Sequence, residues 1–123
     1  MRNQPKYHFL KNTKYALNGL IDLIKTETSF RIEIILFVIL MPVIIFIDAV
    51  LVHKLFMFMS LMGILMAETI NSAIERVVDL VTMDYNQMAG RAKDIGSTIV
   101  FLSIFVFIVT WVVILLHNFW RNS

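Results

Sequence analysis

Apolar residues dominate three long segments of the chain and follow a helical spacing in a fourth, near the N-terminus. There, Leu17, Leu20, Ile21 and Ile24 recur at the spacing of one helix face, while lysines occupy other faces. This pattern predicts an amphipathic helix over about residues 6–26 that lies along a membrane surface. Packing of the same helix on the end of a helical bundle is an alternative that is compatible with the first.

The three apolar segments predict transmembrane helices over about residues 30–50, 55–81 and 95–117. A helix needs about 20 predominantly apolar residues to cross a bilayer. The third segment meets this requirement without a single charge in its interior. The uncharged centre of the first is shorter, so Arg31 and Glu33 must sit at its interfacial end.

The composition agrees with a membrane protein. Hydrophobic residues make up 59% of the 123 residues and charged residues 16%, whereas a soluble domain has about 45–50% and about 25%. We therefore predict an all-α fold with a single membrane-integral domain, residues 1–123. The chain has no cysteine, which excludes disulfides and thiolate chemistry. Its basic residues form no dense patch, which argues against nucleic acid as a partner.

Lysine and arginine predict the orientation in the membrane, because they are enriched in cytoplasmic segments. Only Lys54 and Arg121 fall at one end of the predicted bundle. The basic residues at the other end are Arg2, Lys6, Lys11, Lys14, Lys25, Arg31, Arg76, Arg91 and Lys93. The N-terminus and the polar loop 82–94 are therefore predicted to be cytoplasmic, and the C-terminus to lie outside.

A polar stripe crosses the second predicted span. On a helix, Glu68, Ser72, Glu75 and Asp79 fall within roughly 60° of one another, with Asn71 beside them. A charged carboxylate at the bilayer centre costs about 2.5–3.5 kcal/mol. An acid at the depth of Glu68 therefore needs a partner or a function. The alternative is a polar contact between helices, in which Asn71 and Ser72 form the hydrogen bonds.

Charges from the other spans reach the same end of the bundle. They are Glu27, Arg31, Glu33, Lys93 and Asp94. Two carboxylates at this level can hold Mg²⁺ together with phosphate oxygens, and Lys93 can contact phosphates as a point charge. The deeper Glu68 suits a general base that acts on a hydroxyl held at headgroup depth. Three thin helices cannot enclose a soluble phosphate donor together with a lipid. A neighbouring subunit is therefore expected to complete the site.

Two sequence motifs carry a family resemblance. The run Ala67-Glu-Thr-Ile-Asn-Ser-Ala-Ile-Glu75, followed by Val78-Asp79, and the run Gly90-Arg-Ala-Lys-Asp-Ile-Gly-Ser97 resemble the integral-membrane diacylglycerol kinases of bacteria. Phe30 to Glu33 and Tyr15 to Gly19 fit the same pattern, so the resemblance covers nearly the whole chain. It implies a homotrimer in the bacterial inner membrane with a periplasmic C-terminus. It also implies transfer of the γ-phosphate of Mg-ATP to diacylglycerol, which gives phosphatidic acid.

The resemblance also implies roles for individual residues. Glu68 would be the general base with Asn71 in support, and Glu27 and Glu75 would bind the metal. The implied ATP contacts are His8, Tyr15, Glu27, Glu75, Asp84, Tyr85, Asn86, Lys93 and Asp94. The implied lipid contacts are Ser29, Phe30, Arg31, Ile32, Glu33, Glu68 and Ser97. The chain departs from the family pattern at His8, Asn18, Asp84 and Asn86.

Two other functions are compatible with the sequence. An undecaprenol kinase of the same family would use a long polyprenol in place of diacylglycerol, although such kinases tend to be alanine-rich where this chain has Gly96-Ser97. A small proton-coupled transporter would use Glu68 as its titrating carboxylate. It would show pH-driven flux without ATP consumption, and it would leave Lys93, Asp94 and the Glu27/Glu75 pair without a purpose.

Overall fold

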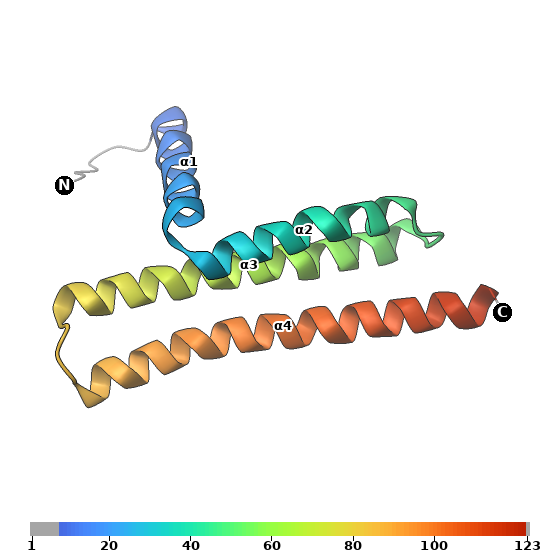
Figure 1. Cartoon of the computed structure of the whole chain (residues 1–123). Helices are drawn as coiled ribbons and strands as arrows, with labels where there is room; N and C mark the ends of the chain where they lie inside the picture. Colours follow the sequence, from blue (N-terminus) through green and yellow to red (C-terminus); the bar gives the residue numbers. More distant parts are fainter. Residues whose placement is uncertain (1–7, 123) are drawn as a thin grey trace.

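The computed structural model describes residues 8–122, which form four helices and no strand. They are α1 (Phe9–Thr26), α2 (Thr28–Phe46), α3 (Leu51–Val81) and α4 (Gln87–Asn122). Helices α2, α3 and α4 run side by side, and α1 leaves the bundle at a steep angle (Figure 1). Arg2 and Lys6, which contributed to the predicted orientation, lie outside the described residues, as does the predicted start of the first helix at residue 6.

Three of the helices are long and apolar enough to cross a membrane, namely α2, α3 and α4. The prediction of an all-α protein with three candidate spans is therefore confirmed. Helices α3 and α4 contain 31 and 36 residues, well above the roughly 20 that a bilayer requires. Each therefore has a polar extension beyond the apolar part.

Several helix bounds differ from the predicted ones: α2 begins at Thr28 rather than at residue 30, α4 ends at Asn122 rather than at residue 117, and three further bounds differ as follows. Helix α4 begins at Gln87, within the predicted polar loop 82–94, because Asn86 caps it: the Ala89 N–H donates to Asn86 Oδ1 at 3.0 Å. Helix α3 begins at Leu51 rather than at residue 55, and α2 ends at Phe46 rather than at residue 50. The sequence predicted a short connection between these two helices, but it placed the connection a few residues too late because several residues of the turn are apolar.

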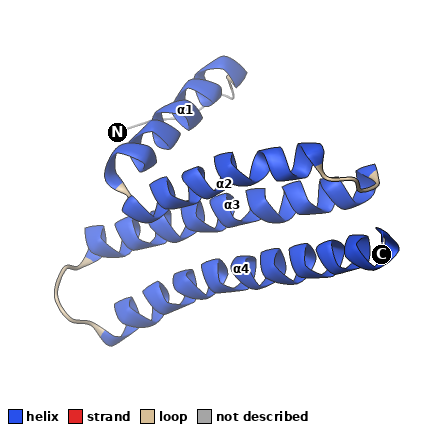
Figure 2. Ribbon diagram, turned by 45° about the vertical axis from the view of Figure 1, so that its right-hand side comes forward, coloured by secondary structure: helices blue, strands red, loops and turns tan. Residues whose placement is uncertain are grey.

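The apolar core lies where α3 packs between α2 and α4 (Figure 2). It consists of Ile44 from α2, Met57 and Leu61 from α3, and Trp111 and Ile114 from α4. The Trp111 indole N–H donates to the carbonyl of Met57 at 3.2 Å. This bond satisfies the one polar atom of the indole without interrupting the apolar contact.

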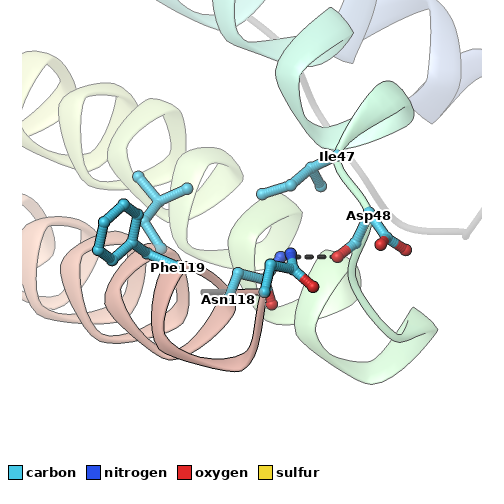
Figure 3. Close-up of a pocket in the computed structure, with 6 residues that line it drawn as sticks. Ile47, Asp48, Asn118 and Phe119 are labelled. Carbon is cyan, nitrogen blue, oxygen red and sulfur yellow. Dashed lines mark hydrogen bonds between the residues drawn. The ribbon is translucent and has the colours of Figure 1, made fainter.

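The end of the bundle opposite to α1 is fastened through the α2–α3 turn. Asn118 Nδ2 of α4 donates to the carbonyl of Asp48 at 2.8 Å, and Arg121 Nη2 donates to the same carbonyl at 2.9 Å. Asp48 and Asn118 border a pocket of about 340 Å³ that Ile47 and Phe119 also line (Figure 3). The contacts hold the end of α4 against the turn.

Helices α3 and α4 approach each other closely at Gly96. This glycine is buried in α4, and a Cβ atom added to it would collide with Asn71 Oδ1 of α3. The neighbouring Ile74 side chain would lie 3.6 Å from the same atom. Gly63 of α3 has no such neighbour within 4 Å. The absence of a side chain at position 96 therefore sets the distance between the two helices at the level of Asn71.

Gly96→Ala is therefore expected to destabilise the protein by about 1–3 kcal/mol, the usual cost of overpacking a tight contact. Gly63→Ala is the matched control, and it should be neutral or stabilise the fold by about 0.5–1 kcal/mol, because alanine is the better helix former. Thermal unfolding of both variants in the same detergent measures the difference. Equal melting temperatures for the two variants would contradict the close approach at Gly96.

Candidate active site

The polar stripe of α3 lies on the helix face that is also its apolar core face. The buried residues of α3 are Met57, Ser60, Leu61, Ile64, Ala67, Glu68, Asn71 and Ser72. Glu68 is only 7% exposed and Ser72 only 2%. The stripe is therefore turned toward the neighbouring helices and not toward the outside of the chain. Sequence spacing predicted the stripe, and the structure shows that Glu68, Asn71 and Ser72 are buried, whereas Glu75 and Asp79 are partly exposed.

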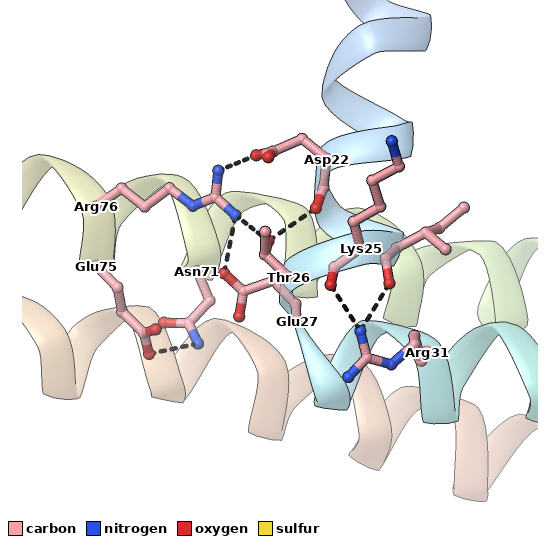
Figure 4. Close-up of polar contacts among 9 residues, drawn as sticks. Asp22, Lys25, Thr26, Glu27, Arg31, Asn71, Glu75 and Arg76 are labelled. Atoms are coloured by element: carbon pink, nitrogen blue, oxygen red, sulfur yellow. Dashed lines mark hydrogen bonds and ion pairs between the residues drawn. The ribbon is translucent and has the colours of Figure 1, made fainter.

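Asn71 and Glu75 form a hydrogen-bonded pair one turn beyond Glu68. Asn71 Nδ2 donates to Glu75 Oε1 at 3.2 Å (Figure 4). The Asn71 carbonyl oxygen and the Ser72 hydroxyl are buried and accept or donate no hydrogen bond among the described residues. Asn71 thus orients the carboxylate of Glu75 while it packs against Gly96.

The carboxyl groups of Glu33 and Glu68 interact across the contact of α2 and α3. Glu27, at the junction of α1 and α2, and Glu75 contribute their negative charges at Glu68 as well. One oxygen of Glu33 is buried without a hydrogen-bond partner. Four acids from different elements therefore share one region, and such a region attracts cations.

Arg76 connects α3 to the corner between α1 and α2. Its guanidinium forms an ion pair with Asp22 through Nη1, and Nη2 donates to Thr26 Oγ1 at 2.8 Å and to Glu27 Oε1 at 3.1 Å (Figure 4). Asp22 and Arg76 were not among the predicted site residues. Their spacing of more than fifty residues leaves no local signal, although the position of Arg76 directly after Glu75 marks it as part of the charged end of α3.

Arg31 stabilises the same corner in a different way. Its Nη1 donates to the carbonyls of Ile24 at 2.8 Å and Lys25 at 3.0 Å, and its Nη2 donates to Thr28 Oγ1 at 3.0 Å. The guanidinium thus satisfies carbonyls at the C-terminal end of α1, which have no partner within the helix. The structure thus shows that Arg31 stabilises the turn, and the lipid contact that the family resemblance implied for it stays a prediction.

A second cluster lies at the turn between α3 and α4. Lys93 Nζ donates to Asp79 Oδ1 at 2.7 Å in a half-exposed ion pair. A pocket of about 250 Å³ adjoins this pair, and its polar lining residues are Asp79, Thr82, Asp84, Tyr85, Asn86 and Lys93. The structure therefore brings together four of the predicted ATP contacts and adds Asp79 to them.

The other predicted site residues are more scattered. His8 and Tyr15 lie on or next to α1, while Ser29, Ile32, Asp94 and Ser97 are exposed on the helices that carry them. Two of the predicted lipid contacts are buried within the chain, Phe30 at 2% and Glu68 at 7% exposure. The aromatic ring of Phe30 therefore contributes to the core of the chain.

The donor set fits a divalent cation that is shared with another ligand. Among residues 8–122, no three histidine, aspartate or glutamate side chains are arranged to hold a metal by themselves. Glu27 and Glu75 offer carboxylate oxygens, the ligands that hard cations prefer. Magnesium in phosphoryl-transfer sites is commonly held by one or two carboxylates and completed by phosphates and water. The pair thus suits a cation that arrives with a nucleotide.

Comparison with known proteins identifies the family. The family described as prokaryotic diacylglycerol kinase matches residues 14–115. The diacylglycerol kinase of Haemophilus influenzae is 37% identical over 104 residues, which cover 85% of this chain and 88% of the relative. That of Escherichia coli K12 is 32% identical over 110 residues (89% and 90%), and that of Pseudomonas aeruginosa is 36% identical over 107 residues (87% of each). The chain therefore belongs to the prokaryotic diacylglycerol kinase family.

Proposed function

We propose that this chain is an ATP-dependent lipid kinase that transfers the γ-phosphate of ATP to the free hydroxyl of diacylglycerol and so produces phosphatidic acid. The family supports the reaction. One structural observation supports the location of the active site, because acids from the α1–α2 junction, α2 and α3 converge at one end of an apolar bundle. Such a place suits a kinase with one water-soluble and one membrane-bound substrate.

The enzyme works in the bacterial inner membrane, with the acidic end of the bundle on the cytoplasmic side. The excess of lysine and arginine at that end supports this orientation. Helix α1 then lies at the cytoplasmic surface, in agreement with its exposed apolar residues, among them Leu10 and Leu17, and with its lysines. The C-terminal end of α4 is periplasmic.

A homotrimer is the proposed assembly. In the most apolar stretch of α2, and likewise in that of α4, only 11% of the residues are buried within the chain. The rest of these faces is available to lipid and to neighbouring subunits. Several buried polar atoms at the acidic end also have no partner within the described chain, which supports a site that a second subunit completes.

The catalytic roles follow from depth and contacts. Glu68 lies deepest among the acids of α3 and is buried, so it is placed to accept the proton of a lipid hydroxyl. The hydroxyl oxygen then attacks the γ-phosphorus in line, and ADP leaves. Asn71 orients Glu75, and Lys93 contacts the phosphates from the N-terminal part of α4. Glu27 and Glu75 would hold Mg²⁺, which offsets the negative charge of the phosphates.

A phosphorylation assay on the purified protein tests the function itself. In mixed micelles with ATP and Mg²⁺, diacylglycerol should be converted to phosphatidic acid, and removal of the metal with a chelator should stop the reaction. Undecaprenol in the same micelles should be a poor substrate. Faster phosphorylation of undecaprenol would assign the protein to the other lipid. Proton flux without ATP consumption would contradict a kinase altogether.

Glu68→Gln should lower kcat by at least about 100-fold, because the amide cannot accept the proton of the hydroxyl. Its size is nearly that of glutamate, so the protein should stay folded. Asp48→Asn is the matched control, since it makes the same change at the periplasmic end, where the side chain is largely exposed. Activity of Glu68→Gln near that of the control would rule out Glu68 as the base.

Lys93→Ala should raise the KM for Mg-ATP about tenfold or more, which corresponds to ~1.4 kcal/mol. The variant also breaks the ion pair with Asp79, so Asp79→Asn serves as the comparison. If Lys93 binds phosphate, Asp79→Asn should affect the KM much less than Lys93→Ala. Equal effects of the two substitutions would reduce Lys93 to a structural partner of Asp79.

A further inference from the structure

A single guanidinium joins three acceptors at the corner between α1 and α2. Arg76 follows Glu75 on α3, and its fork reaches Asp22, Thr26 and Glu27 at once (Figure 4). Thr26 Oγ1 in turn donates to the carbonyl of Asp22 at 2.7 Å. The planar fork of arginine makes such contacts with a defined geometry, whereas a lysine ammonium acts as a point charge. The contact thus specifies orientation as well as charge.

Apolar packing does little to fix this corner. Leu23 is the one buried residue of α1 within its range Phe9–Thr26. A cavity of about 470 Å³ separates α1 from α3, and Asp22, Leu23, Ser72 and Arg76 are among the residues that line it. Arg76 crosses the space between the two helices where side-chain packing does not fill it. Leu23, Phe30 and Arg31 also hold the corner in place, but the hydrogen bond from Arg76 links the carboxylate of Glu27 directly to α3.

The charges of the contact are balanced in a way that leaves Glu27 negative. Arg76 engages Oε1 of Glu27, and the contacts described for residues 8–122 leave the other oxygen of that carboxylate unused. Asp22 forms the closer ion pair with the same guanidinium. The positive charge is therefore shared between two acids, and Glu27 keeps the net negative charge that a cation requires.

We infer that Arg76 is a positioning residue, which orients the carboxylate of Glu27 toward Glu75 for metal binding, and that Asp22 is its charge partner. The inference rests on the proposed role of Glu27. Arg76 itself touches neither the metal nor the substrates in this scheme. An ion pair between half-exposed side chains contributes little to stability, so the main effect of the contact is on the geometry of the site.

Direct binding of Mn²⁺ in the presence of a non-hydrolysable ATP analogue tests this inference without turnover. Electron paramagnetic resonance of free Mn²⁺ gives the dissociation constant. Arg76→Ala should raise that constant about five- to tenfold, the range expected for loss of one charge-assisted hydrogen bond at a partly exposed site. The kcat at saturating metal should change much less, because Glu68 is untouched.

Three further variants separate positioning from fold. Arg121→Ala makes the same change at the periplasmic end and should leave Mn²⁺ binding unaltered. Asp22→Asn should weaken binding, because Arg76 then neutralises Glu27 more fully. In Arg76→Ala, the additional change Asp22→Asn should have little further effect, since Asp22 acts through Arg76. Arg76→Lys should bind Mn²⁺ with an affinity between those of the wild type and the alanine variant.

Two results would overturn the inference. Unchanged Mn²⁺ binding in Arg76→Ala, with a lowered melting temperature, would show that the contact stabilises the fold and does not position Glu27. Tighter binding would show that Arg76 competes with the metal for Glu27. Failure of the proposed function is distinguishable from both, because the wild-type protein would then phosphorylate no diacylglycerol.

Discussion

Carboxyl groups inside an apolar helix bundle are costly, and the structure is arranged around this cost. Glu68, Asn71 and Ser72 occupy the face of α3 that farther along the helix carries Met57 and Leu61. The packing that builds the core therefore also removes these polar groups from lipid. Their free energy of burial is offset only in part within the chain, because Asn71 and Glu75 are paired whereas Ser72 is not.

The contact between α3 and α4 positions the hydrogen bond between Asn71 and Glu75, which offsets part of the cost of burying these polar groups. Gly96 allows α4 to approach Asn71 closely, and the pinned Asn71 side chain holds Glu75. The same approach brings Lys93, about one turn before Gly96, to Asp79, about one turn after Glu75. A single small residue in α4 thus controls the position of both the carboxylate proposed for the metal and the lysine proposed for the phosphates.

The sequence predicted the elements and the chemistry better than the contacts. Hydropathy is a local property, so it indicated the three spans, and helical periodicity placed Glu68, Glu75 and Asp79 on one stripe. The pairs Asp22–Arg76 and Asp79–Lys93 depend on how helices pack, and no spacing rule connects such distant residues. The start of α4 was missed because the polar segment after Asn86 has the composition of a loop, although Asn86 caps it as a helix.

The two ends of the bundle differ in how completely their polar groups are satisfied. At the end of the bundle that holds the α2–α3 turn, the carbonyl of Asp48 receives hydrogen bonds from both Asn118 and Arg121, and Asn118 Oδ1 is the one buried side-chain oxygen there without a partner among the described residues. At the opposite, acidic end, three such oxygens, from Glu33, Asn71 and Ser72, are buried without partners in the described chain. Buried polar atoms without partners destabilise a fold by about 1–3 kcal/mol each. A protein retains them where a ligand or a second subunit supplies the missing bonds, and here they surround the base proposed for catalysis.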